Sequence, residues 1–390
     1  MTGMHPHCAG MLGLQHRSFS LAQPKCHIAS FLKQCGYRTV LSGVEHTSSN
    51  PAQVGYDLVL SNQDTNYPAT ADDPPAAPAA AKFLHDIGDQ PFFLSVGLNE
   101  THRPFPSPEP STFEHEDERY CTPPRPLPDT PQIRRDFAAF KASARHMDDA
   151  YGLVLDALSQ AGLAENTLVC CFTDHGLQFP RNMCNLTDHG IGVYLVIRGP
   201  GGFSSRTVNA GLVVDELSSL IDLFPTVCDV CELPKPDWLQ GVSLTPIVNE
   251  RISVRDQIQA QINYHASYEP TRCVRTRRYK YIRRFDRRSA LVLSNVDQSP
   301  SKTQLLNFGW NDQQRETEML FDLAFDPDEV NNLTAPPAMA QTLTQMRQRL
   351  DQWMRDTHDP LCAGPVPAPR GARLNDPDQH SPKDPTTIIN

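Results

Sequence analysis

Residues 166–176 read Asn-Thr-Leu-Val-Cys-Cys-Phe-Thr-Asp-His-Gly and join an apolar run directly to a polar turn. The apolar part, residues 167–172, has the length and composition of a β-strand that is buried on both faces, as in parallel sheets. Asp174 and His175 follow at once, at the carboxyl end of that strand. In open α/β sheets this edge forms the crevice that binds ligands. The stretch therefore predicts an α/β fold with a ligand site after this strand.

The segments on the N-terminal side of this stretch alternate between strands and helices. Residues 37–42 and 91–96 predict two further sheet strands, and residues 27–35 and 134–161 predict amphipathic helices. We therefore assign residues 1–250 to a core in which helices flank a mostly parallel sheet.

Beyond residue 250 the pattern changes to short strands and one terminal helix over residues 339–357. We interpret residues 251–362 as a smaller C-terminal α+β domain. The tail, residues 363–390, is rich in proline and aspartate, and we predict that it is disordered.

The composition is that of a globular protein, with 39% hydrophobic residues, 21% charged residues and a net charge of −10. The negative charge argues against nucleic acid as a partner, because phosphate backbones need a positive surface. No apolar stretch reaches the roughly 20 residues that cross a bilayer, so we expect no membrane partner. Residues 1–18 lack the basic start and apolar run of a secretory signal. The compartment and the oligomeric state stay unassigned.

Asp174 and His175 are the first candidates for a functional site. A carboxylate and an imidazole on one turn can bind a divalent cation, which would neutralise an anionic substrate. The alternative is a helix N-cap aspartate followed by a surface histidine, and the spacing alone does not separate the two. The tetrapeptide Thr-Asp-His-Gly recurs at residues 187–190. That copy precedes a strand, so we expect loop structure there, away from the ligand edge.

Two more histidines each follow a predicted sheet strand by a short loop. His46 comes after residues 37–42, and His102 comes after residues 91–96. Together with His175 they would converge on the carboxyl edge of the sheet. Imidazoles in that position suit proton transfer to a leaving group and hydrogen bonding to an oxyanion.

Residues 275–288 contain eight basic side chains in fourteen positions. They could receive a sulfated or phosphorylated sugar, or nucleic acid. We favour the alternative, an edge strand with its tyrosines turned inward and its arginines turned outward.

Several motifs in a fixed order resemble the sulfatase family. They are the stretch 166–176, Phe-Phe-Leu-Ser-Val-Gly-Leu-Asn-Glu-Thr-His-Arg-Pro-Phe (92–105), His-Met-Asp-Asp-Ala-Tyr-Gly (146–152), Leu-Gln-Gly-Val-Ser-Leu-Thr-Pro (239–246) and Leu-Phe-Asp-Leu-Ala-Phe-Asp-Pro (320–327). The likeness runs from residue 1 to about residue 362 and is greatest to the heparan N-sulfatase (N-sulfoglucosamine sulfohydrolase) type.

This resemblance implies an alkaline-phosphatase-like α/β fold that hydrolyses sulfate esters or sulfamates, with sulfated saccharides such as heparan sulfate as substrates. It also implies a bound Ca²⁺ and a nucleophile that is made by oxidising a cysteine to formylglycine. By position, Asp174 and His175 match the family's second pair of metal ligands. His46 matches the histidine of Gly-Lys-x-His, and His102 matches the histidine near the leaving group. We assign Arg103, in the same His-Arg-Pro loop, to substrate binding.

The chain departs from the family pattern at three places. It begins inside the helix that follows the family's Asp-Asp pair and Cys-x-Pro-Ser-Arg motif, and none of its eleven cysteines starts that motif, so we assign no nucleophile. Val44 and Met183 stand where the family has lysines that face the sulfate. One lost donor of this kind can cost about 3–4 kcal/mol of transition-state stabilisation.

We therefore expect a truncated chain whose set of Ca²⁺ ligands is incomplete and whose activity is impaired or absent. Two alternatives stay open, a non-catalytic binder of sulfated saccharides and a phosphoesterase of the wider superfamily. Because the family's first strand lies within the sheet, we also expect unpaired strand edges and poor solubility.

Overall fold

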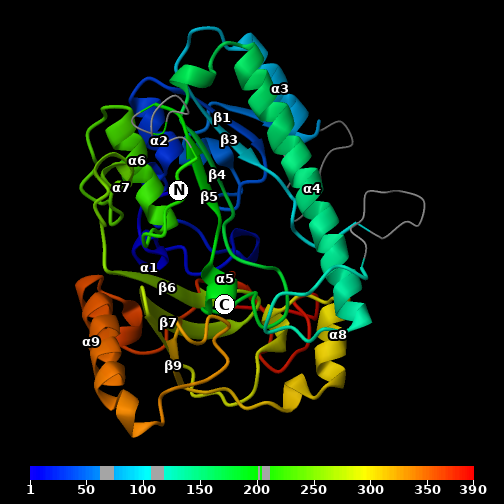
Figure 1. The fold of residues 1–390 in the computed structure, drawn as a ribbon. Coiled ribbons are helices and arrows are strands. Elements are labelled where there is room, and N and C mark those ends of the chain that lie inside the picture. The colour runs from blue at the N-terminus through cyan, green and yellow to red at the C-terminus, as the bar shows by residue number, and fades with distance from the viewer. Residues whose placement is uncertain (62–73, 107–117, 201–202, 204–210) are drawn as a thin grey trace.

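The computed structural model of the chain describes residues 1–61, 74–106, 118–200, 203 and 211–390 (Figure 1). An α/β core forms one half of the molecule, and a four-stranded antiparallel sheet with its helices forms the other. Within the described residues, no helix combines the length and the apolar character that a membrane span requires.

The first sheet of the core is parallel, as predicted. Strand β1 (Arg38–Gly43) lies between β2 (Leu58–Ser61) and β3 (Phe92–Gly97), in the order β2-β1-β3. In the register of β1 with β3, Gly43 stands opposite Gly97, so the two strands end at the same level. The core helices are α1 (Pro6–Ala9), α2 (Ile28–Gln34), α3 (Ala76–Asp86), α4 (Pro131–Gln160), α5 (Asp188–Ile191), α6 (Leu223–Val230) and α7 (Thr245–Glu250).

The strands of the second core sheet run in opposite directions, whereas we expected a parallel arrangement. Strand β4 (Val169–Phe172) pairs with β5 (Leu195–Arg198), and this pair is antiparallel. The prediction that β3 and β4 are buried on both faces is also wrong, because every residue of both strands is only partly buried. Each of these strands has one hydrogen-bonded neighbour among the described residues, and the other edge is unpaired there. An unpaired edge leaves strand surface accessible to solvent.

The long helix α4 forms because its apolar residues recur three and four positions apart and bury one face. Thr130 caps its N-terminus by accepting a hydrogen bond from the amide of Ile133, at 3.3 Å. Pro131 occupies the first helical position, where a missing amide hydrogen costs nothing. The helix packs against α3 and against α8 (Pro300–Asn307), so it spans both halves of the molecule (Figure 1).

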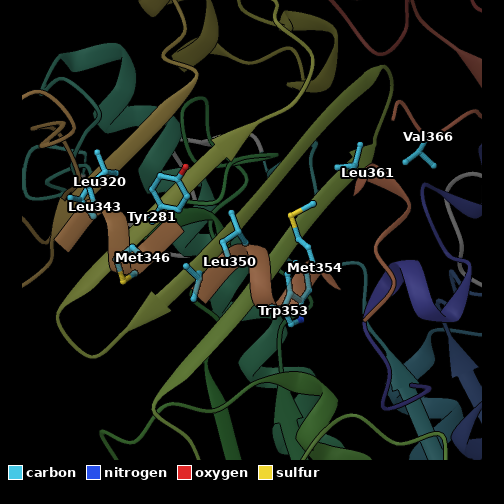
Figure 2. Close-up of a cluster of buried hydrophobic side chains, with 10 residues drawn as sticks. Tyr281, Leu320, Leu343, Met346, Leu350, Trp353, Met354, Leu361 and Val366 are labelled. Carbon is cyan, nitrogen blue, oxygen red and sulfur yellow. The ribbon is translucent and has the colours of Figure 1, made fainter. Parts of the chain in front are cut away.

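The C-terminal sheet contains β6 (Gln257–Tyr264), β7 (Tyr268–Thr276), β8 (Tyr279–Arg284) and β9 (Glu318–Asp322), all antiparallel and in chain order. Helix α9 (Ala340–Asp356) covers one face of it. Figure 2 shows the core between them, in which Tyr281 and Leu320 of the sheet meet Met346, Leu350 and Trp353 of the helix.

The basic stretch 275–288 is structural for the most part. Strand β8 lies between β7 and β9 and is not an edge strand, which corrects that part of the prediction. Carboxylates pair with six of its eight cations, which are Arg275, Arg277, Arg278, Lys280, Arg283 and Arg288.

The structure also contradicts the prediction that the tail is disordered. Residues 363–390 pack against the C-terminal sheet and form β10 (Arg373–Leu374) and β11 (Thr387–Ile388), which pair with each other. Val366 and Ala372 are buried, and the hydroxyl of Tyr264 donates to the carbonyl of Val366 at 2.6 Å. Val366 joins the core beneath α9, and Ala372 packs with Phe19 and Tyr264, so the few apolar residues of the tail fix it at two points.

Candidate active site

The loops after β1 and β3 carry His46 and His102 from one level of the sheet. The amide of Val44 donates to the carbonyl of Gly97 at 2.9 Å, directly beyond the paired ends of the two strands. A Cβ atom on Gly97 would lie 2.1 Å from the carbonyl oxygen of Val44, so only glycine permits this approach. The loops that carry His46 and His102 therefore begin side by side, as the sequence predicted.

The turn after β4 presents Asp174 and His175 to solvent. A carboxylate oxygen of Asp174 accepts from the amide of His175 at 3.0 Å, and Nδ1 of His175 lies 2.8 Å from the carbonyl oxygen of Gly176. A carbonyl only accepts, so in the neutral imidazole Nδ1 carries the proton and Nε2 has the lone pair. No helix begins at Asp174, which removes the N-cap alternative. Both side chains are exposed and able to contact a ligand.

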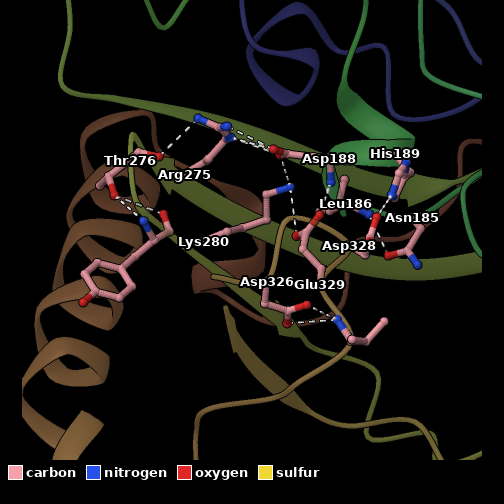
Figure 3. Close-up of polar contacts among 12 residues, drawn as sticks. Asn185, Leu186, Asp188, His189, Arg275, Thr276, Lys280, Asp326, Asp328 and Glu329 are labelled. Atoms are coloured by element: carbon pink, nitrogen blue, oxygen red, sulfur yellow. Dashed lines mark hydrogen bonds and ion pairs between the residues drawn. The ribbon is translucent and has the colours of Figure 1, made fainter. Parts of the chain in front are cut away.

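The second Thr-Asp-His-Gly copy has a structural role (Figure 3). Asp188 opens the short helix α5 and pairs with Arg275 at 3.0 Å and with the buried Lys280 at 2.5 Å. His189 lies 3.3 Å from Asp328. This copy also supports the first one, because the amide of Gly176 donates to the carbonyl of Gly190 at 2.9 Å.

His102 is exposed and is oriented by its own loop. Its Nδ1 lies 2.6 Å from the carbonyl oxygen of Arg103, so the same argument leaves its Nε2 as a hydrogen-bond acceptor. An imidazole with an exposed lone pair can take up a proton or coordinate a cation.

Arg103 is held by the protein itself. Its guanidinium forms two hydrogen bonds of 2.8 Å to the carboxylate of Asp136 on α4 and lies 4.0 Å from the ring centre of Phe105. Its backbone amide donates to the side chain of Gln178 at 2.7 Å. The charge of Arg103 is therefore satisfied internally, and the side chain clamps the loop after β3 onto α4.

Three residues that the sequence did not mark lie near these loops and come from other parts of the chain. Asp297 accepts a hydrogen bond of 2.7 Å from Gln178, which follows Asp174 and His175 on the same loop. The ring of His16 lies 6.4 Å from that of His46, between centroids. Burial lowers the pKa of His265 to about 4, where Asp297 opposes the shift and Arg17, His175 and His16 add to it. No sequence pattern marks these residues, because distant segments bring them together.

The positions that depart from the family pattern add no charge to the crevice. Met183 is buried, with 8% of its surface exposed, and Val44 takes part through its backbone. The cysteine of the same loop, Cys184, is half-buried, and desolvation raises the pKa of its thiol well above the usual range. A protonated thiol is a poor nucleophile.

Asp174 and His175 do not complete a calcium site with their neighbours. Ca²⁺ takes about six to eight oxygen ligands. Throughout the described part of the chain, no group of three or more histidine, cysteine, aspartate and glutamate side chains is placed to hold a metal ion. Asp174 and His175 alone would supply two ligands, which is fewer than a calcium ion takes.

The comparison with known protein families decides the identity. The sequence model of the Sulfatase family matches residues 1–233. The chain belongs to the sulfatase family. A second model, N-sulphoglucosamine sulphohydrolase, C-terminal, matches residues 174–309. Members of the sulfatase family generally bind a divalent metal.

Relatives of this sulfatase agree with both matches. The human N-sulphoglucosamine sulphohydrolase is 27% identical over 94% of this chain and 81% of its own length. A solved structure described as a complex with its substrate, D-glucosamine-2-N,6-O-disulfate, has a TM-score of 0.69 at 15% identity, over 92% of this chain and 87% of the other. A phosphonate monoester hydrolase from Silicibacter pomeroyi has a TM-score of 0.62 at 18% identity, over 93% and 85% of the two chains. These two structures share the fold, which confirms the alkaline-phosphatase-like α/β prediction.

Proposed function

We propose that this sulfatase acts on sulfate esters or sulfamates of sulfated sugars, and on glucosamine sulfates in particular. The observation that carries the proposal is the 27% identity to human N-sulphoglucosamine sulphohydrolase, which extends over 94% of the chain. The exposed His46, His102, Asp174 and His175 support it, because each lies on a loop that follows a strand of the core.

Each residue has a proposed role in that reaction. Asp174 and His175 would provide two ligands of a divalent cation, which is calcium by resemblance to the family. When bound, such a cation neutralises negative charge on the sulfate group. His102 would exchange a proton with the leaving group through Nε2, since Nδ1 is engaged with the carbonyl of Arg103. His46 would donate a hydrogen bond to a sulfate oxygen.

We further propose that the chain as written binds its substrate better than it turns it over. Val44 and Met183 stand where the family resemblance places lysines, and they provide no cation for the sulfate. Arg103 does not replace them, because its guanidinium is committed to Asp136. Because such cations would stabilise the transition state, their loss favours a binder of sulfated saccharides over an efficient hydrolase.

One experiment tests both parts. Binding of glucosamine N-sulfate to the full chain is measured by calorimetry, and release of sulfate is followed with the same compound. We expect saturable binding that His102→Ala weakens and that the matched variant His85→Ala, on the exposed surface of α3, leaves unchanged. Rapid sulfate release by this chain would contradict the proposed impairment. No binding, or equal binding by both variants and the parent, would contradict the proposed site.

A further inference from the structure

A cavity of about 750 Å³ adjoins His102 and Arg103. Its walls come from the loop after β3, the first turns of α4, residues 297–300 and the tail residues Ser381, Pro382 and Lys383. Pockets for small ligands usually measure about 300–1,000 Å³. The cavity therefore has room for a sugar unit next to His102.

The tail forms a fixed wall of this cavity. Arg17, itself buried, donates to the carbonyl of Pro382 at 2.9 Å and to the side chain of Asn375 at 2.8 Å. The carboxylate of Asp384 accepts from the amides of His380 and Ser381, at 2.9 and 2.8 Å, and so closes the turn before Lys383. A ligand would meet a preformed surface there, which lowers the entropic cost of binding.

The cavity is cationic although the whole chain is acidic. Its lining contains three cations, Arg103, Arg135 and Lys383, and two carboxylates, Asp136 and Asp297, which leaves one net positive charge. The chain as a whole carries −10. A local field of this sign attracts an anionic ligand.

Lys383 is the cation of the lining that is available to a ligand. Arg103 pairs with Asp136, and Arg135 pairs with Glu118 at 2.7 Å. The Lys383 side chain is exposed and has no ion pair or hydrogen bond within the residues that the structure describes.

The rest of the lining suits a carbohydrate. Pro104, Phe105, Pro131, Pro300 and Pro382 all line the cavity and offer flat apolar surface. The apolar C–H faces of a sugar ring can pack on such surfaces while charged groups fix its orientation.

We propose that this cavity binds the sugar unit that follows the sulfated one, and that Lys383 recognises an anionic group on it, a carboxylate or a sulfate. The proposal rests on the proposed function, because it places the second sugar beside the leaving-group histidine. It makes the C-terminal tail a determinant of substrate choice.

Calorimetry with four probes tests the proposal on the full chain. The probes are glucosamine N-sulfate alone and three disaccharides in which it is joined to a uronic acid, to a sulfated hexose or to a neutral hexose. The variants are Lys383→Met, which keeps the apolar stem of the side chain, and Lys25→Met, an exposed lysine far from the cavity, as the control. Comparison of the uronic acid disaccharide with the sulfated hexose disaccharide shows whether the recognised anionic group is a carboxylate or a sulfate.

We expect an anionic disaccharide to bind roughly tenfold more tightly than the neutral one, as one charge-assisted hydrogen bond would give. Lys383→Met should remove that tenfold gain and leave the affinity for glucosamine N-sulfate within about twofold of the parent. Loss of affinity for all four probes alike, or for none, would overturn the inference. Failure of the monosaccharide itself to bind would overturn the proposed function, whereas binding of the monosaccharide with no gain from any second sugar would overturn this inference alone.

Discussion

The ammonium group of Lys302 lies 2.5 Å from the backbone carbonyl oxygen of His380 and donates a hydrogen bond to it. The same group donates to the carbonyls of Leu293 and Val296, at 2.8 and 2.5 Å. Burial lowers the pKa of this lysine to about 8. The buried Lys302 side chain therefore joins the C-terminal tail to the segment that ends in Asp297. The tail and that segment form two walls of the same cavity.

The variant Lys302→Met should loosen the tail. It leaves three carbonyl groups without their donor, and we expect the free energy of unfolding to fall by about 2–4 kcal/mol. Hydrogen exchange should accelerate at residues 380–384, while Lys25→Met leaves both quantities unchanged. If the amides of residues 380–384 keep their protection in Lys302→Met, then Lys302 does not anchor the tail.

Removal of Arg103 should affect stability more than a substrate-binding residue would. Asp136 is buried, with 5% of its surface exposed, and would lose the cation that satisfies both of its oxygens. We expect Arg103→Met to lower the free energy of unfolding by about 3–5 kcal/mol. Arg135→Met breaks a pair whose side chains are 57% and 41% exposed and should cost less than about 1 kcal/mol. Urea denaturation measures the free energy of unfolding of both variants and of the parent.

The opposite result for Arg103 would restore the sequence-based interpretation. An Arg103→Met chain that unfolds at the same urea concentration as the parent, yet has lost its affinity for glucosamine N-sulfate, would show that the guanidinium contacts the substrate and not the scaffold.

A side chain at Gly176 should displace the turn that carries Asp174 and His175. A Cβ atom there would lie 2.1 Å from the carbonyl oxygen of His189. The two Thr-Asp-His-Gly copies would have to separate, so we expect Gly176→Ala to weaken sugar binding at least tenfold and to cost about 1–3 kcal/mol of stability.

The matched control for Gly176 is Gly152→Ala in α4, where an added Cβ meets nothing within 4 Å. That variant should stabilise the helix by up to about 1 kcal/mol, since alanine is the better helix former. Equal sugar affinities in the two variants would mean that the contact between the copies does not position the site. The comparison uses calorimetry for affinity and thermal unfolding for stability.

The sequence predicted those features of the fold that depend on local pattern. The apolar runs over residues 91–96 and 167–172 coincide with β3 and β4, and the candidate His46, His102, Asp174 and His175 follow their strands as expected. The loops that carry His46 and His102 follow two adjacent parallel strands, and parallel strands end at one edge, so the order of strand and loop suffices to place these two loops together.

Features that depend on distant segments were not predictable in this way. His16, His265 and Asp297 lie near the candidate residues but come from three separate parts of the chain, and no spacing relates them. The tail was wrongly predicted to be disordered because its composition counts apolar residues without regard to where they pack. Only two of them, Val366 and Ala372, are buried there, while the buried Arg17 and Lys302 supply hydrogen bonds from elsewhere.

Acid should destabilise the chain through His27. This side chain is fully buried, and burial lowers its pKa to about 3, although Glu45 lies 3.9 Å away. The unfolded chain has an ordinary histidine with a pKa near 6.5, so between about pH 6.5 and 3 the unfolded state binds more protons. The stability that neutral His27 contributes is therefore fully present above about pH 6.5. It is lost as the pH falls, by roughly 2 kcal/mol between pH 6.5 and 5.

The variant His27→Asn separates this contribution from the rest. His27 caps α2 by accepting from the amide of Ala29 at 3.2 Å, and asparagine can keep that contact without titrating. Urea denaturation gives the free energy of unfolding at pH 5 and at pH 7. We expect the difference between these two values to be about 2 kcal/mol smaller in the variant than in the parent. The exposed His85→Asn should retain the difference seen in the parent. Parallel pH profiles for all three chains would mean that His27 is not the group that titrates, and His5 and His265, whose pKa values burial lowers to about 4, would be the next to substitute.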